Sequence, residues 1–381
     1  MMKVRLFPDG LVHSAYIEML TNPPDNIEYI GDFKHAHLYG NVSITNRLGR
    51  YIFDRAGLPY IFKVNDKNTD YDLVHSCQKL VLTNNDFVID IEHGNPFMGY
   101  SNIKKTNSVL FRKLVSKTLN DDRCIGVLPW SEAAYNAFAL NFSFLGKEFM
   151  KDKVDVIYPA VSIPRIFPEK YDKFTFIFIG GGDMHARGVD ILMESFDILK
   201  KVSDCDLIIV VNDFKDVEKL VRKYKVTERI RIYTSMPRNE LLTMIGRSHC
   251  LVMPSMCDTF GMVALEAMAR KLPIIMTDNF AAREIVSNYE NGVLLKPCKN
   301  VKPVFDMFGR KILNKAEFHS QFKNYVPSDA AIYDLYVTMS SMVCEEKEAK
   351  KMGNKGFGMV SSGKFSIGMR NKNLLKAYNS N

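Results

Sequence analysis

The sequence predicts an α/β protein made of two doubly wound domains, and two observations support this prediction. Short apolar runs typical of strands alternate with amphipathic segments typical of helices, which is the pattern of a parallel sheet covered on both faces. An irregular stretch with three prolines, Pro159–Tyr171, interrupts the alternation, which then begins again. The length of 381 residues fits two domains of fewer than about 200 residues each.

Residues 1–158 contain the elements expected of one such domain. Apolar and β-branched runs predict strands, and apolar residues at helical spacing predict helices. The predicted strands are Lys3–Phe7, Asp72–His75, Phe87–Ile91, Cys124–Leu128 and Val154–Tyr158. The predicted helices are Val12–Leu20, Lys104–Leu119 and one beginning near Ser131. The helix Lys104–Leu119 is expected to bury Val109, Leu110, Leu114, Val115 and Leu119, and to expose Lys104, Lys105, Arg112, Lys113 and Lys117.

The second half repeats the alternation more regularly. Its predicted strands are Phe174–Ile179, Leu207–Val211, Ile230–Tyr233, Cys250–Met253, Pro273–Met276 and Val293–Leu295. Its predicted helices are Gly188–Lys201, Asp213–Tyr224, Glu240–Gly246, Val263–Arg270, Ala330–Cys344, Glu345–Gly353 and Ile367–Tyr378. The irregular, basic segment 300–325 receives no role from its sequence.

Composition and charge narrow the classes of function. No apolar run approaches the length of a membrane span, the N-terminus lacks a signal-peptide core, and seven scattered cysteines favour a reducing, cytoplasmic compartment. The net charge of +8 lies entirely in residues 156–381, which hold 33 of the 51 basic and 25 of the 43 acidic residues. This excess would attract an anionic ligand or membrane surface, or it is an ordinary solvated surface. Nucleic acid is disfavoured because the basic residues are dispersed among acidic ones.

The stretch Pro254–Ala269 joins a buried strand to a helix through a loop that contains Gly261. Glycine permits close approach of a ligand to the backbone, and a helix N-terminus suits a phosphate. The Glu266 carboxylate, one turn into the helix, could accept hydrogen bonds from the two hydroxyls of a ribose. The residues thus suggest a nucleoside diphosphate site. The alternative is an ordinary helix that Asp258 or Thr259 caps, with Glu266 facing solvent.

Two further segments carry candidate ligand-binding residues. Gly180, Gly181 and Gly182 follow the first strand of the second domain, at a spacing that is not the nicotinamide fingerprint, and a plain flexible turn is the alternative. Arg187, before the next helix, can grip a diphosphate bidentately, or it is a surface arginine.

Histidines outside these segments are weaker candidates. His93 follows a predicted strand, where it could donate a hydrogen bond or shuttle a proton, although a lone histidine is more often structural. The pairs His35–His37 and His75–Cys77 lack a second pair at ligand spacing, so no bound metal is expected.

These segments together resemble a known family. Pro-Ser-x-x-Asp-x-Phe-Gly-x-x-x-x-Glu-Ala-Met-Ala is similar to the signature of the family-four retaining glycosyltransferases of the GT-B fold, in which two acidic residues are separated by seven others. Phe-Ile-Gly followed by Ala-Arg-Gly-Val-Asp-Ile-Leu resembles the phosphate-binding segment of that family. The resemblance is strongest over residues 156–296. It implies two Rossmann-like domains facing across a cleft, and transfer of a sugar from a nucleoside diphosphate to an acceptor.

The resemblance also implies roles for individual residues. Glu266 would bind the ribose, the backbone of Phe260, Gly261, Met262 and Val263 would hold the diphosphate and sugar, and Gly180, Gly182 and Arg187 would bind phosphate. Asp258 and His93, taken as the catalytic residues, would lie near the donor sugar. The leaving diphosphate would deprotonate the acceptor, so neither a metal ion nor another cofactor is expected. Asp258 is one methylene shorter than the usual glutamate, and Gly181 replaces a usual arginine.

We therefore expect a hexosyltransferase-type enzyme. Residues 1–158 with the helix in 362–381 would form the acceptor-binding domain, and residues 159–361 the donor-binding domain. The expected partners are a nucleotide-sugar donor and a glycan, lipid-linked or small-molecule acceptor, with peripheral contact of the basic helix Lys104–Leu119 to an anionic membrane as a further hypothesis. The alternatives are a catalytically degenerate nucleotide-sugar-binding protein and a same-fold epimerase or phosphorylase.

Overall fold

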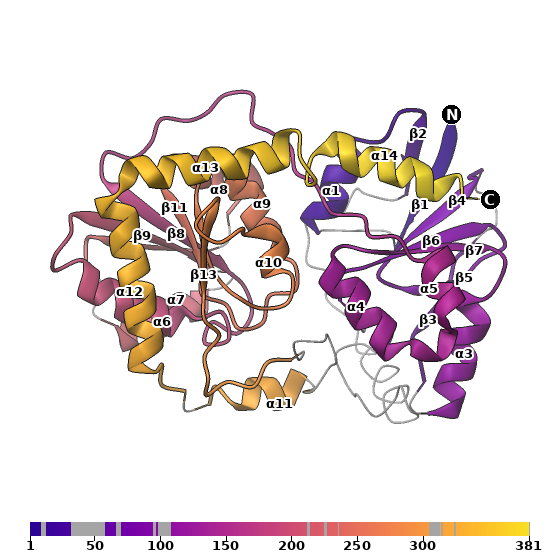
Figure 1. The fold of residues 1–381 in the computed structure, drawn as a ribbon, viewed down its shortest axis with the longest axis horizontal. Helices are drawn as coiled ribbons and strands as arrows, with labels where there is room; N and C mark the ends of the chain where they lie inside the picture. The colour runs from indigo at the N-terminus through magenta and orange to yellow at the C-terminus, as the bar shows by residue number, and fades with distance from the viewer. Residues whose placement is uncertain are drawn as a thin grey trace. The chain divides into compact units, whose positions relative to one another are not determined.

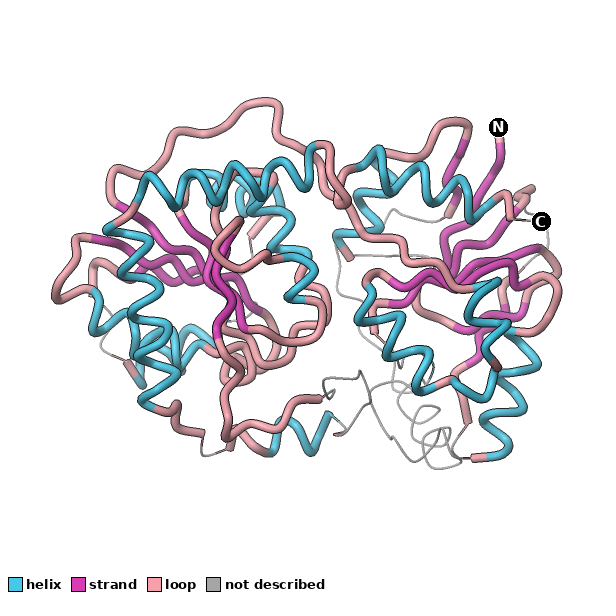
Figure 2. Tube along the Cα trace, viewed as in Figure 1, coloured by secondary structure: helices cyan, strands magenta, loops and turns pink. Residues whose placement is uncertain are grey.

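The chain divides into two compact units in the computed structural model, each built around its own parallel sheet (Figures 1 and 2). Unit 1 comprises Met1–Ala160, Val304–Ala316 and Ile367–Asn381, and unit 2 comprises Val161–Pro303 and Glu317–Ser366. The structure describes residues 1–8, 13–31, 58–65, 70–93, 97, 108–211, 214–224, 227–234, 236–304, 313, 315–323 and 325–380. His35, His37, Lys104 and Lys105 lie outside the described residues.

The main sheet of unit 1 is parallel throughout, in the order β2-β1-β4-β6-β7. Its strands are β1 (Met2–Phe7), β2 (Ile27–Ile30), β4 (Leu73–Cys77), β6 (Asp86–Ile91) and β7 (Cys124–Pro129). Two short strands, β3 (Ile61–Lys63) and β5 (Leu80–Leu82), pair separately. Strands β4 and β7 are buried along their whole lengths, as expected of a parallel sheet whose two faces are covered.

Helices cover this sheet on both sides (Figure 1). On one side lie α1 (Ser14–Thr21) and α14 (Ile367–Tyr378), and on the other lie α3 (Val109–Leu119), α4 (Glu132–Asn141), α5 (Lys147–Lys153) and the 3₁₀ turn η3 (Ser143–Leu145). The Ser108 and Ser131 hydroxyls cap α3 and α4 by accepting backbone N–H bonds. A core of packed aromatic rings under α3 and α4 includes Phe97, Phe111, Phe138 and Phe142.

Two predictions for unit 1 are wrong. Val154–Tyr158 is not a strand, because only Val154 forms a bridge, to Val127, before the regular pattern ends. The neighbouring Pro129 of β7 has no N–H with which to continue the ladder. Helix α3 does not bury Val109 and Leu110, which are 81% and 51% exposed. Its buried residues are Phe111, Val115, Thr118 and Leu119, so the apolar stripe is centred on Phe111.

The sheet of unit 2 is also parallel, in the order β10-β9-β8-β11-β12-β13. Its strands are β8 (Phe174–Gly180), β9 (Cys205–Val211), β10 (Ile230–Tyr233), β11 (Cys250–Met253), β12 (Ile274–Thr277) and β13 (Gly292–Leu295). Numbered within the unit, this is the order 3-2-1-4-5-6 of a Rossmann domain. The predicted doubly wound fold is confirmed for both units.

The helices of unit 2 largely follow the prediction, with one clear difference. They are α6 (Val189–Leu199), α7 (Phe214–Lys223), α8 (Arg238–Arg247), α9 (Met262–Met268), α10 (Ala282–Ile285), α12 (Asp329–Cys344) and α13 (Glu346–Ser361), with α11 (Lys315–Ser320) inside the segment left without a role. Helix α13 continues past Gly353, where the prediction ended it. A Cβ on Gly353 would fall 2.0 Å from the Lys271 carbonyl oxygen, so this glycine marks close packing rather than a helix end.

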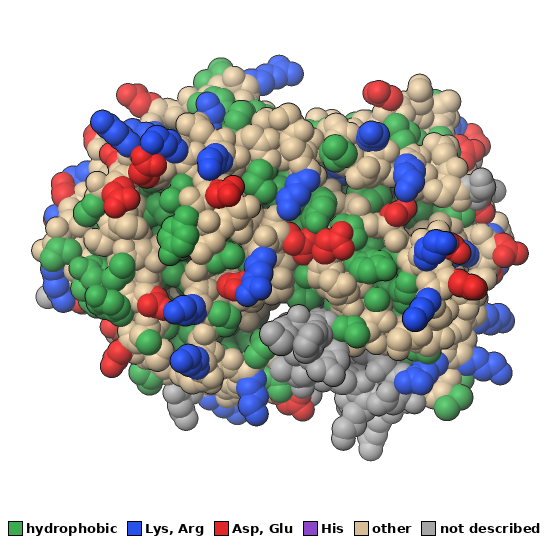
Figure 3. All heavy atoms as spheres, viewed as in Figure 1, with side chains coloured by type: hydrophobic (Ala, Val, Ile, Leu, Met, Phe, Trp, Pro, Cys, Tyr) green, Lys and Arg blue, Asp and Glu red, His purple; other side chains and the backbone are tan. Residues whose placement is uncertain are grey.

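None of the helices in the described part of the chain is long and apolar enough to cross a membrane. On the face drawn in Figure 3, lysine and arginine side chains lie scattered among aspartates and glutamates. This dispersal agrees with the charge distribution of the sequence.

Candidate functional site

The strand order of unit 2 creates a switch point between β8 and β11. From β8 the chain winds outward through β9 and β10, and from β11 it winds the other way through β12 and β13. The loops that follow β8 and β11 leave the same edge of the sheet in opposite directions, and open α/β sheets bind ligands between such loops. The predicted site residues of this unit lie at the end of β8, in these two loops and in helix α9, which follows β11.

Backbone contacts join the two loops to each other. The Met256 N–H donates to the Ala186 carbonyl oxygen at 2.8 Å. Gly188 has a φ of +78°, and a Cβ at this position would fall 2.0 Å from the Pro254 carbonyl oxygen. Only glycine satisfies both the left-handed conformation and this close approach. The two loops are therefore one connected structure.

The glycine turn after β8 is tight at one end and open at the other. Gly180 is the last residue of the strand, and a Cβ there would meet the Phe178 ring at 2.7 Å. Gly182 has a φ of +82° with nothing within 4 Å of a Cβ position. The turn thus leaves uncovered backbone that a ligand can reach.

Arg187 and Asp258 form an ion pair between the two loops. Arg187 also donates from Nε to the Gly181 carbonyl oxygen at 3.2 Å. The Arg187 side chain is 31% exposed and the Asp258 side chain 13% exposed. Arg187 is therefore not an isolated surface arginine. It is held near the glycine turn but remains reachable by an anion.

Helix α9 begins without a side-chain cap. Its N-cap is Gly261, with a φ of +83°, and glycine has no side chain with which to cap the helix. The alternative in which Asp258 or Thr259 is the N-cap is thus wrong. Phe260 is buried and packs edge-on against Phe365, and Met262 is buried as well. The loop accordingly offers backbone rather than side chains at this point.

Glu266 is buried, with 3% of its surface exposed, and does not face solvent. Its Oε1 accepts a 2.8 Å bond from Nη1 of Arg238, the first residue of α8. Arg270, also buried, donates to the Glu266 backbone carbonyl and to that of Leu242 in α8, which ties α9 to α8. The carboxylate is therefore already charge-paired at the switch-point edge.

Sequence reasoning missed Arg238, although a signal for it existed. A cation in the first turn of a helix opposes the helix dipole, so an arginine there suggests a nearby anion. The predicted helix began two residues later, at Glu240, and this placement hid the signal.

The Asp190 carboxylate, in the first turn of α6, holds the loop after β8 in place. Asp190 is buried and accepts bonds from His185, Lys223 and the Tyr224 hydroxyl. Burial raises the pKa of Asp190, but these bonds outweigh burial and lower the pKa to about 2. The same carboxylate raises the pKa of His185. Asp190 stays ionised and fixes the segment that carries Arg187.

The segment 300–325, which received no role from its sequence, contributes a contact to the loop after β8. His319 of α11 lies with Nδ1 2.7 Å from an Asp183 carboxylate oxygen, directly after the glycine turn. Asp183 in turn accepts the His185 N–H at 3.1 Å. No sequence pattern linked these residues, because they are more than 130 positions apart.

His93 lies in unit 1, just after β6, and is 7% exposed. The two residues predicted to be catalytic, His93 and Asp258, therefore belong to different units. That both act on one sugar stays a prediction.

The chain is similar in sequence to known glycosyltransferases. Residues 162–329 match the family model described as glycosyl transferases group 1. The chain is 26% identical over 185 residues to the O-antigen chain mannosyltransferase RfbU of Salmonella typhimurium, covering 47% of this chain and 49% of that protein. It is 26% identical over 253 residues to the uncharacterized glycosyltransferase MJ1178 of Methanocaldococcus jannaschii, covering 65% and 64%. The matches thus span less than two thirds of either relative.

One solved structure is similar over the whole chain. HepE from Anabaena, in complex with UDP and glucose, superposes with a TM-score of 0.63 and 14% identity, covering 100% of both chains. At this identity the similarity concerns the fold.

Proposed function

Since residues 162–329 match the family model of the group 1 glycosyltransferases and the chain has the GT-B fold, we propose that the protein transfers a hexose from a nucleoside diphosphate sugar to an acceptor, with retention of anomeric configuration. One observation carries this proposal. At the switch point of unit 2, the partly exposed Arg187 lies in one of two joined loops, the buried Glu266 lies in the helix that follows the other, and the turn at Gly182 leaves backbone uncovered.

Each part of the donor has a proposed partner in unit 2. Glu266 accepts the ribose hydroxyls, while Arg187 and the backbone at Gly180 and Gly182 bind the diphosphate. The backbone from Phe260 to Val263 holds the diphosphate and the sugar. Hydrogen bonds between a charged group and its ligand each contribute about 1.5–3 kcal/mol. Loss of Glu266 or Arg187 should therefore be measurable as weaker nucleotide binding.

The ion pairs in the structure indicate how the donor enters. Arg187 binds Asp258, so an arriving diphosphate competes with this carboxylate for the guanidinium. Once Arg187 turns to the phosphate, Asp258 is released toward the sugar hydroxyls. Arg238 likewise has to share Glu266 with the ribose or leave it. The donor thus replaces contacts that the protein makes with itself.

The reaction we propose needs no metal ion. The bond from the anomeric carbon to the diphosphate oxygen breaks, and a bond from that carbon to the acceptor oxygen forms on the same face. The acceptor proton passes to the leaving diphosphate, so no protein base is required there. Arg187 neutralises the charge that develops on the leaving group. His93 of unit 1 is proposed to donate a hydrogen bond near the donor sugar.

We propose that the acceptor binds the domain formed by residues 1–158 with 362–381. The donor is proposed to bind the domain formed by residues 159–361. RfbU acts on an O-antigen chain, and a glycan or lipid-linked acceptor is our proposal for this chain. The cysteines form no disulfides, which suits the cytoplasm.

Contact with an anionic membrane is part of the same proposal. In α3 the exposed Val109 and Leu110 lie next to the exposed Arg112 and Lys113, and Lys117 follows one turn later. Exposed apolar side chains beside basic ones suit a lipid surface. Flotation with phosphatidylserine vesicles should decrease when Lys113 and Lys117 become glutamate. Unchanged flotation would remove this contact from the proposal.

A second candidate is a nucleotide-sugar-binding protein without turnover. The short Asp258, engaged by Arg187, and Gly181 in place of an arginine favour it. No described feature favours an epimerase or a phosphorylase.

The test is a thermal-shift screen of uridine, guanosine and adenosine diphosphate hexoses, followed by hydrolysis of the best binder with water as acceptor. Stabilisation reports binding. We expect one base to stabilise the protein and proton NMR to show the released sugar with retained configuration. Binding without hydrolysis selects the second candidate, inverted sugar contradicts retention, and no binding contradicts both.

A further inference from the structure

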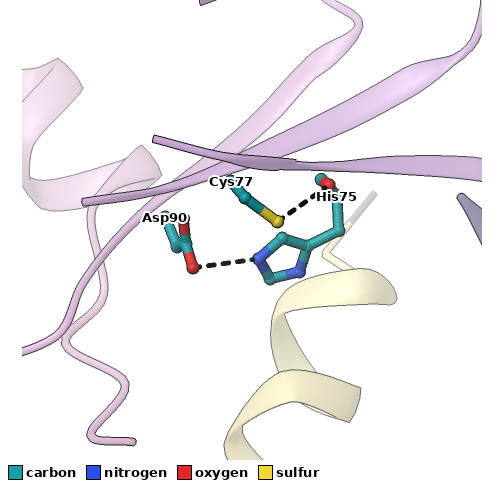
Figure 4. A group of neighbouring side chains, drawn as sticks. All are labelled: His75, Cys77 and Asp90. Atoms are coloured by element: carbon teal, nitrogen blue, oxygen red, sulfur yellow. Dashed lines mark hydrogen bonds and ion pairs between the residues drawn. The ribbon is translucent and has the colours of Figure 1, made fainter. Parts of the chain in front are cut away.

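A histidine, a cysteine and an aspartate meet in the interior of unit 1 (Figure 4). His75 and Cys77 are two positions apart in β4, so their side chains share one face of the sheet. Asp90 in β6 is the register partner of Cys77. One potential ligand atom from each residue lies within 4.8 Å of the others, and all three residues are at most 3% exposed.

One ring nitrogen of His75 is held by a hydrogen bond, and the other makes no hydrogen bond. Its Nδ1 lies 2.7 Å from the Tyr378 hydroxyl of α14, which fixes the ring. Its buried Nε2 makes no hydrogen bond and points toward Asp90, whose nearest carboxylate oxygen is 3.5 Å away (Figure 4). A ring nitrogen that is held by an outer partner while the other faces a carboxylate and a thiol has the arrangement of a metal ligand.

Asp90 is buried as a carboxylate among neutral donors. The Tyr16 hydroxyl, the Gln78 backbone N–H and the Trp130 indole N–H each donate to it at 3.0 Å. Within the described residues, no lysine or arginine hydrogen bonds to it. A buried carboxylate without a cation is costly, whereas a divalent ion with one carboxylate, one thiolate and a neutral imidazole has no net charge.

We propose that unit 1 binds a divalent transition metal ion, zinc or a metal of similar softness, through His75 Nε2, Cys77 Sγ and the Asp90 carboxylate. The mixed nitrogen, sulfur and oxygen ligands select against magnesium and calcium, which prefer oxygen alone. Cys77 loses its proton to the solvent as the metal enters. The site is separate from the proposed sugar transfer, which uses no metal.

A small cavity beside His75 and Asp90 offers room for a water molecule as a fourth ligand. Its volume is about 20 Å³, and His75, Asp90, Trp130 and Arg370 are among its lining residues. This space holds a water molecule, since roughly 10–15 Å³ is enough. Arg370, 3% exposed, has its Nη1 without a hydrogen bond. A water or a small anion bound to the metal would therefore also satisfy this arginine.

The sequence expectation was that no metal binds here, because the His75–Cys77 pair has no second pair at ligand spacing. The fold supplies the missing ligand from the neighbouring strand, 13 residues after Cys77. Strand register, rather than a motif, brings Asp90 to the pair.

The test is cobalt titration of the full-length protein after dialysis against a chelator. We expect one Co²⁺ per chain, with a thiolate-to-cobalt charge-transfer band, and displacement of Co²⁺ by Zn²⁺. In the Cys77→Ser variant the band should vanish, and in His75→Gln the affinity should fall at least tenfold. The matched control is Cys124→Ser, since Cys124 is equally buried in β7 of the same unit but outside the cluster.

Failure of the wild-type protein to bind Co²⁺ or Zn²⁺ would overturn the proposal, as would a band that Cys124→Ser removes and Cys77→Ser keeps. If the variants do not fold, the melting temperature of the wild-type protein decides. Zn²⁺ should raise it by several degrees and Mg²⁺ should not, and no rise with Zn²⁺ counts against the site. Neither readout depends on nucleotide binding, so this proposal and the proposed function can fail separately.

Discussion

Both units hold a cluster of charged and polar groups, in the strands of unit 1 and in the loops and helices that follow strands in unit 2, but the two clusters are enclosed differently. In unit 2, Asp258 and Glu266 are largely buried, while their partners Arg187 and Arg238 each keep 31% of their side chains exposed. In unit 1, Asp90 is surrounded by buried groups, including Tyr16, Trp130 and His75. An exposed arginine can exchange a carboxylate for an incoming phosphate. An enclosed cluster has room only for something as small as an ion or a water.

The C-terminal helix accounts for part of this difference. Helix α14 packs on unit 1, where Tyr378 bonds to both His75 and Tyr29, and Arg370 donates to the Asn22 carbonyl oxygen. Unit 2 leaves its switch-point arginines partly open. Two units that are both doubly wound can therefore present one exchangeable site and one closed site, and the fold class alone does not tell them apart.

The largest change in stability is expected in the enclosed cluster of unit 1, which consists of His75, Cys77 and Asp90. Asp90→Ala leaves two buried donors and one partly buried donor without their acceptor, and should lower the free energy of unfolding by about 3–5 kcal/mol, measured by urea denaturation after removal of metal. Asp204→Ala is the control, because that side chain is 61% exposed and surface ion pairs contribute about 0–1 kcal/mol. Equal losses in the two variants would show that the cluster is not specially enclosed.

Substitution of Arg187, at the switch point of unit 2, should change the affinity for nucleotide rather than the stability of the fold. Arg187→Ala removes a charged partner of the diphosphate, so affinity for the nucleoside diphosphate should fall about 10- to 100-fold, corresponding to about 1.5–3 kcal/mol. Calorimetry measures this, with Arg283→Ala as the control, since Arg283 pairs with Asp278 on the surface of the same unit. A similar loss in both variants would argue against a specific phosphate contact.

The next largest effect is expected at the contact between the loops after β8 and β11, where Gly188 meets the Pro254 carbonyl. Gly188→Ala places a Cβ against the Pro254 carbonyl and strains a φ of +78°, so unit 2 should lose at least about 1–3 kcal/mol of stability. Gly358→Ala is the opposite control, because its Cβ meets nothing within 4 Å inside α13 and should stabilise the helix by about 0.5–1 kcal/mol. A neutral Gly188→Ala would mean that the two loops are not tightly joined.

The smallest expected effect is on the pH dependence of stability, to which two histidines of unit 2, His249 and His185, should contribute with opposite signs. Burial lowers the pKa of His249 to about 4, from an ordinary value of 6.5. The folded state therefore loses stability as pH falls below about 6.5 and the loss levels off near 4, by no more than about 2 kcal/mol because the ring is partly exposed. His249→Gln should remove this acid sensitivity in melting curves.

His185 should show the opposite sign. Its carboxylate partner Asp190 raises the pKa, so its contribution is full below about 6.5 and is lost as pH rises through the raised value. His185→Gln should flatten the alkaline side of the stability profile. If both substitutions flattened the same side, the assigned environments would be wrong.

Local patterns predicted most of the fold, because buried parallel strands are continuous apolar runs and helices show their own period. The helix Ile367–Tyr378 has the predicted bounds. The failures came from tertiary contacts. Pro129 has no N–H to donate to the segment after Val154, and Gly353 lies inside α13, where the Lys271 carbonyl leaves no room for a Cβ.

The candidate site divides in the same way. Sequence spacing singled out Arg187, Asp258 and Glu266, and the structure brings Arg187 and Asp258 into contact. The sequence could not reveal that Arg238 pairs with Glu266, that His319 bonds to Asp183, or that Asp90 lies next to His75. Each of these contacts joins segments separated by many residues, so only the folded chain defines them.

The most direct test of the account is calorimetric binding of a nucleoside diphosphate to the wild-type protein and to Glu266→Gln. The substitution keeps the shape of the side chain but removes the negative charge of the carboxylate that we propose binds the ribose hydroxyls. We expect affinity to fall at least tenfold in Glu266→Gln and to stay unchanged in Glu240→Gln, an exposed glutamate in α8. Equal affinity in all three proteins would contradict the claim that the switch point of unit 2 is the donor site.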